Sequence, residues 1–309
     1  MKLAVLMSTY NGEKYLKEQI NSILAQKVNF HFDLIVRDDG STDNTLKILD
    51  SYSQKKELTY YVGRNVGPAN SFISLLRKVR HYDFYAFSDQ DDIWHIDKLQ
   101  KGVNSLLSLK KPAIYFSNGL LVDSELNSLG RNTHKNKPIC TFESILCGSC
   151  SAQGCTSIFN AQLAELIQNC RYPEFCVMHD SFLTSLCKLV DGVIIYDDFS
   201  SIKYRMHSNN VCGVYISKGT FLFKIYDKIK RKIYSIIKKK EISFFDQCEC
   251  LLNVYGSYIS EINKNKCKAI IMARSSIISR IKLVLNKNIK SESFTYTLTK
   301  KIEILIGNL

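Results

Sequence analysis

The 309-residue sequence predicts an α/β fold, in which a mostly parallel sheet lies between helices and a basic helical region follows. In the first third of the chain, short apolar runs alternate with stretches of helical periodicity, which is typical of parallel strand–helix units. Polar and acidic loops follow several predicted strands, where parallel sheets bind ligands. Lys and Arg exceed Asp and Glu by 1 up to Gly213 and by 12 after it.

The first part of the chain reads as four strand–helix units. In the first helix, Leu16, Ile20 and Ile23 recur at helical spacing, and Ser41, Thr42 or Asp43 can cap the second helix. We expect strands at 3–7, 32–36, 58–62 and 82–87, each followed by a helix at 13–26, 44–54, 69–79 and 97–108. Further on we expect strands at 113–117 and 193–196 and helices at 161–168 and 181–189.

The end of the chain combines apolar stripes with basic residues. Residues 220–240 place Phe221, Ile225, Ile229, Ile233 and Ile237 at four-residue steps among Lys and Arg, and 269–286 and 299–306 repeat the theme. Such helices suit an anionic membrane surface. Alternatively, the stripes pack on the rest of the protein and the lysines face solvent. No nucleic-acid-reading motif is present, so we expect a catalytic domain at 1–213 and a basic helical region at 214–309.

The sequence shows no export or membrane-spanning signal. Its first apolar run is short for a signal peptide, and no window has the ~18 consecutive apolar residues of a membrane helix. The eleven cysteines are odd in number and scattered, which favours reduced thiols. Cys147 and Cys150 have zinc-ligand spacing, but no second pair accompanies them. We therefore expect a cytoplasmic protein, peripheral on the inner face of the cell membrane.

The motif FSDQDDIW at 87–94 places three carboxylates directly after a buried strand. Carboxylates this close repel one another unless a cation or a hydrogen-bond donor compensates. Together with a diphosphate, Asp89 and Asp91 would form an oxygen shell suited to Mg²⁺ or Mn²⁺. The alternative is a solvated acidic turn. An EF-hand is excluded, because Trp94 stands at the sixth loop position, where that motif needs Gly.

Two earlier loops also follow strands. In RDDGSTD at 37–43, Asp38 and Asp39 can meet a ribose or a base edge, although a turn with a helix cap explains much of the motif. In STYNG at 8–12, Tyr10 can stack on a base, and Thr9 and Asn11 can donate or accept hydrogen bonds. An ordinary strand-to-helix turn is the alternative there.

These motifs together resemble a known family. YNGEKYLKEQINSIL, RDDGSTDNT, GRNVGPANSF and FSDQDDIW have the order and spacing of family-2 glycosyltransferases with the GT-A fold of nucleotide-diphospho-sugar transferases. MHDS at 178–181 and YRMHSNNV at 204–211 resemble the bacterial rhamnosyltransferase-like branch of that family. The resemblance covers about residues 3–213.

The resemblance implies roles for individual residues. It implies nucleotide contacts from Thr9, Tyr10, Asn11, Asp38, Asp39, Asn65 and Asp89. It implies that Asp91 holds the metal and that Asp180 is the general base; the alternative for Asp180 is a helix cap. His207 is expected as a metal ligand or phosphate donor, and the expected diphosphate or acceptor loop contains Arg205, Gly154 and Cys155. The alternatives for these are a surface loop and a tight packing turn.

The expected function is inverting, metal-dependent transfer of one sugar from a nucleotide diphosphate to a surface polysaccharide or glycolipid precursor. The Gln-x-x-Arg-Trp motif of processive synthases is absent, because the only Trp is Trp94 and Ile93 precedes it. The branch resemblance makes dTDP-rhamnose the first expectation for the donor, with UDP-glucose, UDP-galactose and UDP-N-acetylhexosamine as alternatives. Distant alternatives are an aspartyl-phosphate phosphatase, whose motif normally follows the first strand, and a non-catalytic basic membrane adaptor.

Overall fold

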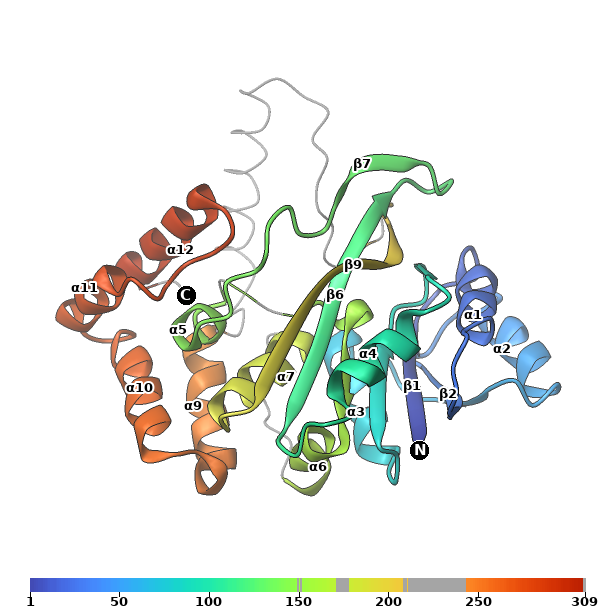
Figure 1. Cartoon of the computed structure of the whole chain (residues 1–309), viewed down its shortest axis with the longest axis horizontal. Coiled ribbons are helices and arrows are strands. Elements are labelled where there is room, and N and C mark those ends of the chain that lie inside the picture. Colours follow the sequence, from blue (N-terminus) through green and yellow to red (C-terminus); the bar gives the residue numbers. More distant parts are fainter. Residues whose placement is uncertain (149, 151, 171–177, 208–209, 211–242, 308–309) are drawn as a thin grey trace.

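The computed structural model describes residues 1–148, 150, 152–170, 178–207, 210 and 243–307, and it confirms the predicted α/β fold (Figure 1). Within these residues nine strands form one sheet in the order β3-β2-β1-β4-β8-β6-β9-β5, with β7 paired to β6. The strands are β1 (Lys2–Thr9), β2 (His31–Asp38), β3 (Thr59–Val62), β4 (Phe84–Ser88), β5 (Ile93–Trp94), β6 (Ala113–Val122), β7 (Ser128–Asn132), β8 (Ile158–Asn160) and β9 (Val193–Arg205).

Helices cover both faces of this sheet. The α-helices are α1 (Leu16–Leu24), α2 (Thr45–Ser53), α3 (Pro68–Lys78), α4 (Lys98–Leu106), α5 (Phe142–Leu146), α6 (Ala161–Asn169), α7 (His179–Leu189), α9 (Phe244–Tyr255), α10 (Glu261–Met272), α11 (Ile277–Leu285) and α12 (Phe294–Ile306). Two short 3₁₀ helices are η1 (Gly154–Thr156) and η2 (Gly256–Tyr258).

The first four strands form the parallel half of the sheet. β1 pairs in parallel with both β2 and β4, and β2 pairs in parallel with β3. Thr9 lies opposite Asp38, and Met7 lies opposite Ser88. The loops that follow β1, β2 and β4 therefore start from one edge of the sheet, as the sequence predicts.

The alternation of β1 divides the core into two layers. Leu3, Val5 and Met7 pack with residues of α1 and α4, whereas Ala4 and Leu6 pack with residues of α3, α6 and α7. All five side chains are fully buried. The central strand is thus apolar on both faces, as expected for a parallel strand covered by helices on each side.

The second half of the sheet differs in length from the prediction. β8 is antiparallel to β4 and β6, while β6 and β9 pair in parallel along ten residues of β6, with register shifts between Ser117 and Gly119. The predicted strands end at 117 and 196, because polar residues such as Asn118 and Asp197 interrupt the apolar pattern. The buried Asn118 bridges this irregularity, since its Nδ2 donates to Asp198 Oδ1 on β9 at 3.2 Å, while its Oδ1 accepts from Thr133 Oγ1 at 2.9 Å.

The C-terminal helices are partly integrated into the core. Phe245, Leu251 and Tyr255 of α9 belong to the same buried cluster as residues of α3 and α7. The basic apolar pattern over 269–286 falls on two helices: α10 ends at Met272 and α11 begins at Ile277, where the Ser276 side chain caps the new helix by accepting from Ser279 N. The predicted helix at 220–240 and the predicted domain boundary after Gly213 lie outside the described residues.

Candidate active site

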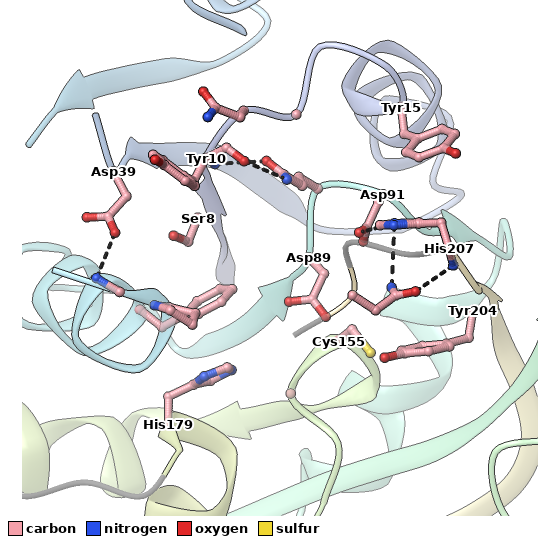
Figure 2. Close-up of a pocket in the computed structure, with 18 of the residues that line it drawn as sticks. Ser8, Tyr10, Tyr15, Asp39, Asp89, Asp91, Cys155, His179, Tyr204 and His207 are labelled. Atoms are coloured by element: carbon pink, nitrogen blue, oxygen red, sulfur yellow. Dashed lines mark hydrogen bonds and ion pairs between the residues drawn. The ribbon is translucent and has the colours of Figure 1, made fainter. Parts of the chain in front are cut away.

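A cavity of about 830 Å³ opens where β1, β2 and β4 end. Tyr10 and Asp39 lie at one end of it, Tyr204 and His207 lie at the other, and Asp89 lies between them (Figure 2). Ten of the thirteen predicted site residues line it: Tyr10, Asn11, Asp39, Asn65, Asp89, Asp91, Gly154, Cys155, Asp180 and His207. Thr9, Asp38 and Arg205 do not line it.

Thr9 and Asp38 lie behind the cavity wall and shape the loop after β2. Both are buried, and Thr9 Oγ1 donates to Asp38 Oδ1 at 2.9 Å. Asp38 Oδ2 accepts from the backbone amides of Gly40 and Ser41, and Oδ1 also accepts from Ser41 Oγ at 2.6 Å. Four donors thus occupy the Asp38 carboxylate, which turns the chain at Gly40, where φ is +84°. The prediction that these two side chains face the nucleotide is not met by this placement.

Asp39 forms part of the cavity wall and is held from behind. Its carboxylate pairs with the buried Arg37 guanidinium and accepts from the amides of Val66 and Gly67 at 2.9 to 3.1 Å. Those amides lie at the start of α3, where the helix dipole favours a negative charge. Arg37 in turn donates to Ser71 Oγ on α3 at 2.7 Å. Asp39 is therefore fixed in position beside Asn65.

Gln90 joins the loop after β1 to the acidic loop, which is the segment 89–92 that follows β4. Its Oε1 accepts from Tyr10 N at 2.9 Å, and its Nε2 donates to Tyr10 O at 3.0 Å. This pairing fixes the backbone of Tyr10 and leaves its ring 48% exposed at the cavity. Asn11 lines the cavity too, but its Oδ1 already accepts from Thr42 N at 2.8 Å.

The acidic loop after β4 concentrates carboxylates in a buried place. Burial, followed by the charges of Asp91 and Asp180, raises the pKa of Asp89 to about 7. Burial and the neighbouring carboxylates also raise the pKa of Asp92 well above its usual range. Asp92 Oδ1 accepts from Arg205 N at 3.2 Å, whereas Oδ2 is buried and has no hydrogen-bond partner within the described part of the chain. This site favours a compensating positive charge.

Asp91 extends from this loop toward the end of β9. His207 Nε2 lies 2.8 Å from Asp91 Oδ2, and the His207 backbone amide donates to Asn210 Oδ1 at 2.6 Å. Both side chains are mostly buried at the cavity wall, with exposures of 15% for Asp91 and 13% for His207. The structure thus brings together the two residues that the sequence predicts as metal ligands.

The donor set at this end of the cavity fits a divalent cation. Ligand atoms of Asp89, Asp92 and Cys155 lie within 4.8 Å of one another, and Asp91 with His207 adds a carboxylate and an imidazole. Carboxylate oxygens suit Mg²⁺ and Mn²⁺, and imidazole suits transition metals. The structural observation that supports this fit is the buried Oδ2 of Asp92, which has no hydrogen-bond partner among the residues that the structure describes.

Lys98 is a component of the site that the sequence analysis missed. It is fully buried on α4, donates from Nζ to the carbonyl oxygen of Cys155 at 2.9 Å, and lies 4.6 Å from the centre of the Trp94 ring. Burial lowers the pKa of Lys98 to about 8, and the nearby carboxylates oppose that change. The sequence does contain a sign that Lys98 is buried, because helical spacing places Lys98 on the same face as Gly102 and Leu106, and that face is otherwise a core face.

Asp180 and His179 enter the cavity from the start of α7. Asp180 Oδ2 accepts from Gly154 N at 3.2 Å and Oδ1 accepts from Ser181 N at 2.6 Å, so η1 and α7 both hold the carboxylate. The N-cap residue is Met178, and Asp180 therefore lies within the first turn rather than capping the helix.

His179 is almost fully buried beneath the cavity. Its ring stacks on Phe72, with ring centres 4.1 Å apart, and neither ring nitrogen has a partner among the described residues. Burial lowers its pKa, which keeps the imidazole neutral.

Arg205 corrects one prediction. It was expected in a polar loop over the diphosphate, but it ends β9 and is 2% exposed. Its guanidinium pairs with Glu18, donates to the carbonyl oxygens of Asp91 and Ser124, and lies 4.4 Å from the centre of the Tyr15 ring. Arg205 therefore fixes the acidic loop from behind, because its hydrogen-bond donors are used within the protein.

Sequence comparison relates this chain to glycosyltransferases. The family model described as "Glycosyl transferase family 2" matches residues 4–158. The dTDP-rhamnosyl transferase RfbG of Shigella flexneri is 31% identical over 222 residues, which cover 68% of this chain and 75% of the relative. An uncharacterized glycosyltransferase of Haemophilus influenzae is 26% identical over 259 residues, covering 83% of this chain and 96% of that protein.

Comparison of structures agrees on the fold. The crystal structure of Staphylococcus aureus TarS residues 1–349, solved in complex with UDP-GlcNAc, superposes with a TM-score of 0.54 and 17% sequence identity. The superposition covers 99% of this chain and 89% of the TarS chain. At this identity the likeness is one of fold.

Proposed function

Because this chain belongs to glycosyl transferase family 2, we propose that it is an inverting enzyme that transfers a single sugar from a nucleotide diphosphate to a saccharide hydroxyl. The observation that carries this proposal is that the acidic loop after β4 and Asp180 of α7 line one cavity. The phosphatase alternative has no such support, because its aspartate motif would follow the first strand, whereas FSDQDDIW spans the end of β4.

The nucleoside is proposed to lie at the end of the cavity formed by Tyr10, Asp39 and Asn65. The half-exposed Tyr10 ring offers a stacking surface for a base. Asp39 keeps a fixed position through Arg37 and the backbone amides just before α3, so it can accept a hydrogen bond from the nucleoside without reorganising. Thr9 and Asp38 then act indirectly, by holding the loop that carries Asp39.

Asp91 and His207 are proposed to hold Mg²⁺ or Mn²⁺, with Asp89 and Asp92 close by. A bound divalent ion acts as a Lewis acid that stabilises the negative charge of a departing diphosphate. Arg205 keeps the backbone of the acidic loop in place through its bond to the Asp91 carbonyl oxygen at 2.8 Å. The loop therefore needs little rearrangement when the donor binds.

Asp180 is proposed as the general base. An acceptor hydroxyl is a weak nucleophile, and a carboxylate within hydrogen-bond reach can take its proton as the new bond forms. The amides of Gly154 and Ser181 hold the Asp180 carboxylate at the cavity wall, and Gly154 and Cys155 are proposed to border the acceptor.

The proposed donor is dTDP-rhamnose, and its support is the similarity to RfbG. TarS was solved with UDP-GlcNAc, so UDP-GlcNAc, UDP-glucose and UDP-galactose belong in the same test. The proposed acceptor is a growing surface polysaccharide or a lipid-linked precursor. An acceptor of that kind would place the enzyme at the cytoplasmic face of the cell membrane.

A donor screen tests this proposal. Each nucleotide-sugar is added with Mn²⁺ or Mg²⁺, and thermal stabilisation and donor hydrolysis are measured. We expect Asp91→Ala to lose metal-dependent stabilisation, whereas Asp180→Asn retains it and loses turnover by a factor of about 100 or more. If neither a chelator nor the Asp91→Ala substitution changes the affinity for the nucleotide, the metal assignment is overturned. Full turnover in Asp180→Asn would overturn the base assignment.

A further inference from the structure

Exposed apolar side chains are concentrated at the C-terminal end of this molecule. Among the described residues, 17 large hydrophobic side chains are exposed, and 13 of them lie between Tyr258 and Ile306. The other four are Met1, Tyr10, Val62 and Leu107. Scattered exposed hydrophobics are ordinary, but a concentration of this kind indicates an interaction surface.

Most of these side chains lie on α11 and α12, which Figure 1 shows at the end of the molecule opposite α1 and α2. Helical spacing places several of them on one face of each helix. We call them the C-terminal apolar patch: Ile278, Ile281 and Leu285 of α11 and Phe294, Leu298, Ile302 and Leu305 of α12. Leu285 is 75% exposed and Phe294 81%, whereas Leu283 and Ile304, on other sides of the same helices, are buried. Each helix is therefore packed on one side and uncovered on another.

The same region carries an excess of positive charge. Residues 258–307 contain ten Lys and Arg against three Glu. Lys282 and Lys301 fall within the two apolar faces by helical spacing. Within the described part of the chain, Lys264 and Lys300 pair with glutamates, but Lys268, Lys282, Lys287 and Lys301 take part in no ion pair. These cations are available to an anionic partner.

We propose that the C-terminal apolar patch inserts into the headgroup region of an anionic lipid bilayer. The proposal deepens the membrane location given above by naming the surface and the lipid chemistry. Isoleucine, leucine and phenylalanine side chains would enter the acyl boundary, while the lysine ammonium groups stay at the level of the phosphates. No described helix is long and apolar enough to span a bilayer. With 13 residues, α12 measures about 20 Å, and the proposal has it lying along the surface, with its apolar face toward the lipid.

The charge pattern argues against other occupants. In a twofold contact between two copies, identical patches would face each other, so the lysines of one patch, Lys282 and Lys301 among them, would lie toward the lysines of the other. A nucleic acid would satisfy the lysines but would leave the exposed aliphatic side chains without an apolar partner. An anionic bilayer satisfies both features, because each basic residue near its surface adds electrostatic attraction to the gain from apolar burial.

Co-sedimentation of the full chain with vesicles tests the proposal. The vesicles contain phosphatidylcholine alone or phosphatidylcholine mixed with phosphatidylglycerol. We expect binding to the mixed vesicles only, with Leu285→Ser plus Phe294→Ser weakening it by about tenfold or more. Lys282→Glu plus Lys301→Glu should weaken it to a similar extent and make the remaining binding less sensitive to salt, because fewer of the basic residues then face the lipid phosphates. The matched control is Val62→Ser plus Leu107→Ser, because these side chains are 53% and 54% exposed elsewhere in the molecule.

Two further readouts separate the outcomes. Hydrolysis of a soluble nucleotide-sugar should be unchanged in all three double variants, so a failure of vesicle binding is distinguishable from a failure of sugar transfer. Light scattering should show a monomer without lipid. Vesicle binding that is equal in wild type and patch variants overturns the proposal, and so does a lipid-free dimer that the patch substitutions dissociate.

Discussion

Lys98 Nζ donates a hydrogen bond to the carbonyl oxygen of Cys155, and the two atoms lie 2.9 Å apart. This contact links helix α4 to η1, the turn that also holds Asp180 through Gly154 N. The ammonium group also lies near Asp89 and Asp92, whose charges raise the pKa of Lys98 against the effect of burial. One buried cation thus supports the turn and offsets part of the negative charge of the acidic loop.

Lys98→Met should destabilise the protein most when no metal is present. The substitution leaves the Cys155 carbonyl oxygen without its donor and removes a charge that compensates two carboxylates, and we expect a loss of about 1 to 3 kcal/mol in the free energy of unfolding. Mn²⁺ should then raise the melting temperature more in the variant than in wild type, because ion and ammonium compensate the same carboxylates. Lys101→Met is the control, since Lys101 is also on α4 and lies over an aromatic ring, that of Phe199 on β9, but is exposed. Equal metal-induced shifts in Lys98→Met and wild type would contradict this account.

His207→Ala should weaken metal binding by about tenfold to a hundredfold, because Asp91 loses the imidazole that lies 2.8 Å from its carboxylate. Isothermal titration with Mn²⁺ in the presence of a nucleoside diphosphate measures this change. His95→Ala is the matched control, because His95 also lies near a carboxylate, Asp97, but is exposed and outside the cavity lining. An unchanged affinity in His207→Ala would remove His207 from the ligand set.

Asp89→Asn should stabilise the metal-free protein at neutral pH. The folded-state pKa of Asp89 is raised from 3.8 to about 7, so protonated Asp89 contributes stability that is present below pH 3.8 and is lost as the pH rises toward 7. The variant lacks this titration, and we expect its free energy of unfolding at pH 7.5 to exceed that of wild type by up to about 4 kcal/mol. Denaturant unfolding in EDTA between pH 5 and 8 measures it. Asp83→Asn, at an exposed position, is the control. A difference between Asp89→Asn and wild type that does not grow with pH would argue against the raised pKa.

The fold was predictable wherever the apolar pattern of a segment matches the burial of its residues in the sheet. Val5 and Leu6 lie on a strand that is apolar on both faces, and the strand–helix alternation around it places the carboxyl ends of β1, β2 and β4 at one edge. The full length of β6 was not predictable, because Asn118 is polar, yet it is buried and satisfied by Thr133, a partner that only the folded chain brings near. Apolar periodicity indicates burial rather than hydrogen-bonded strand pairing. It therefore does not identify strand residues that are stabilised by buried polar contacts.

The site was predictable to the level of its loops. The sequence motifs name Asp39, Asp91 and His207, and the structure brings these residues to one cavity. They do not reveal which member of an adjacent pair faces it: Asp38 turns inward to Gly40 and Ser41, whereas Asp39 lines the wall. Nor do they reveal that Arg205 is buried, because its partners, including Ser124, lie far from it in sequence. Side-chain direction depends on tertiary partners that a linear motif does not contain.

Gly154→Ala should disturb the site through His179. A Cβ atom at position 154 would lie 2.4 Å from His179 Nε2, a separation that packed atoms do not tolerate. The imidazole cannot move away easily, because it stacks on Phe72 at 4.1 Å and meets Phe87 edge-on at 5.1 Å. We therefore expect Gly154→Ala to lower the free energy of unfolding by about 1 to 3 kcal/mol and to displace the amide that holds Asp180.

A double-mutant cycle isolates this contact from a general effect of the new methyl group. In a His179→Ala background the space beside position 154 is empty, so Gly154→Ala should cost less than about 0.5 kcal/mol there. Gly256→Ala is the control, because no atom lies within 4 Å of the position that its Cβ would take. Thermal and denaturant unfolding of the four proteins of the cycle measure the coupling. If the cost of Gly154→Ala were the same in both backgrounds, the close approach of η1 to His179 would not constrain the site, and the backbone of η1 would have to yield instead of the imidazole.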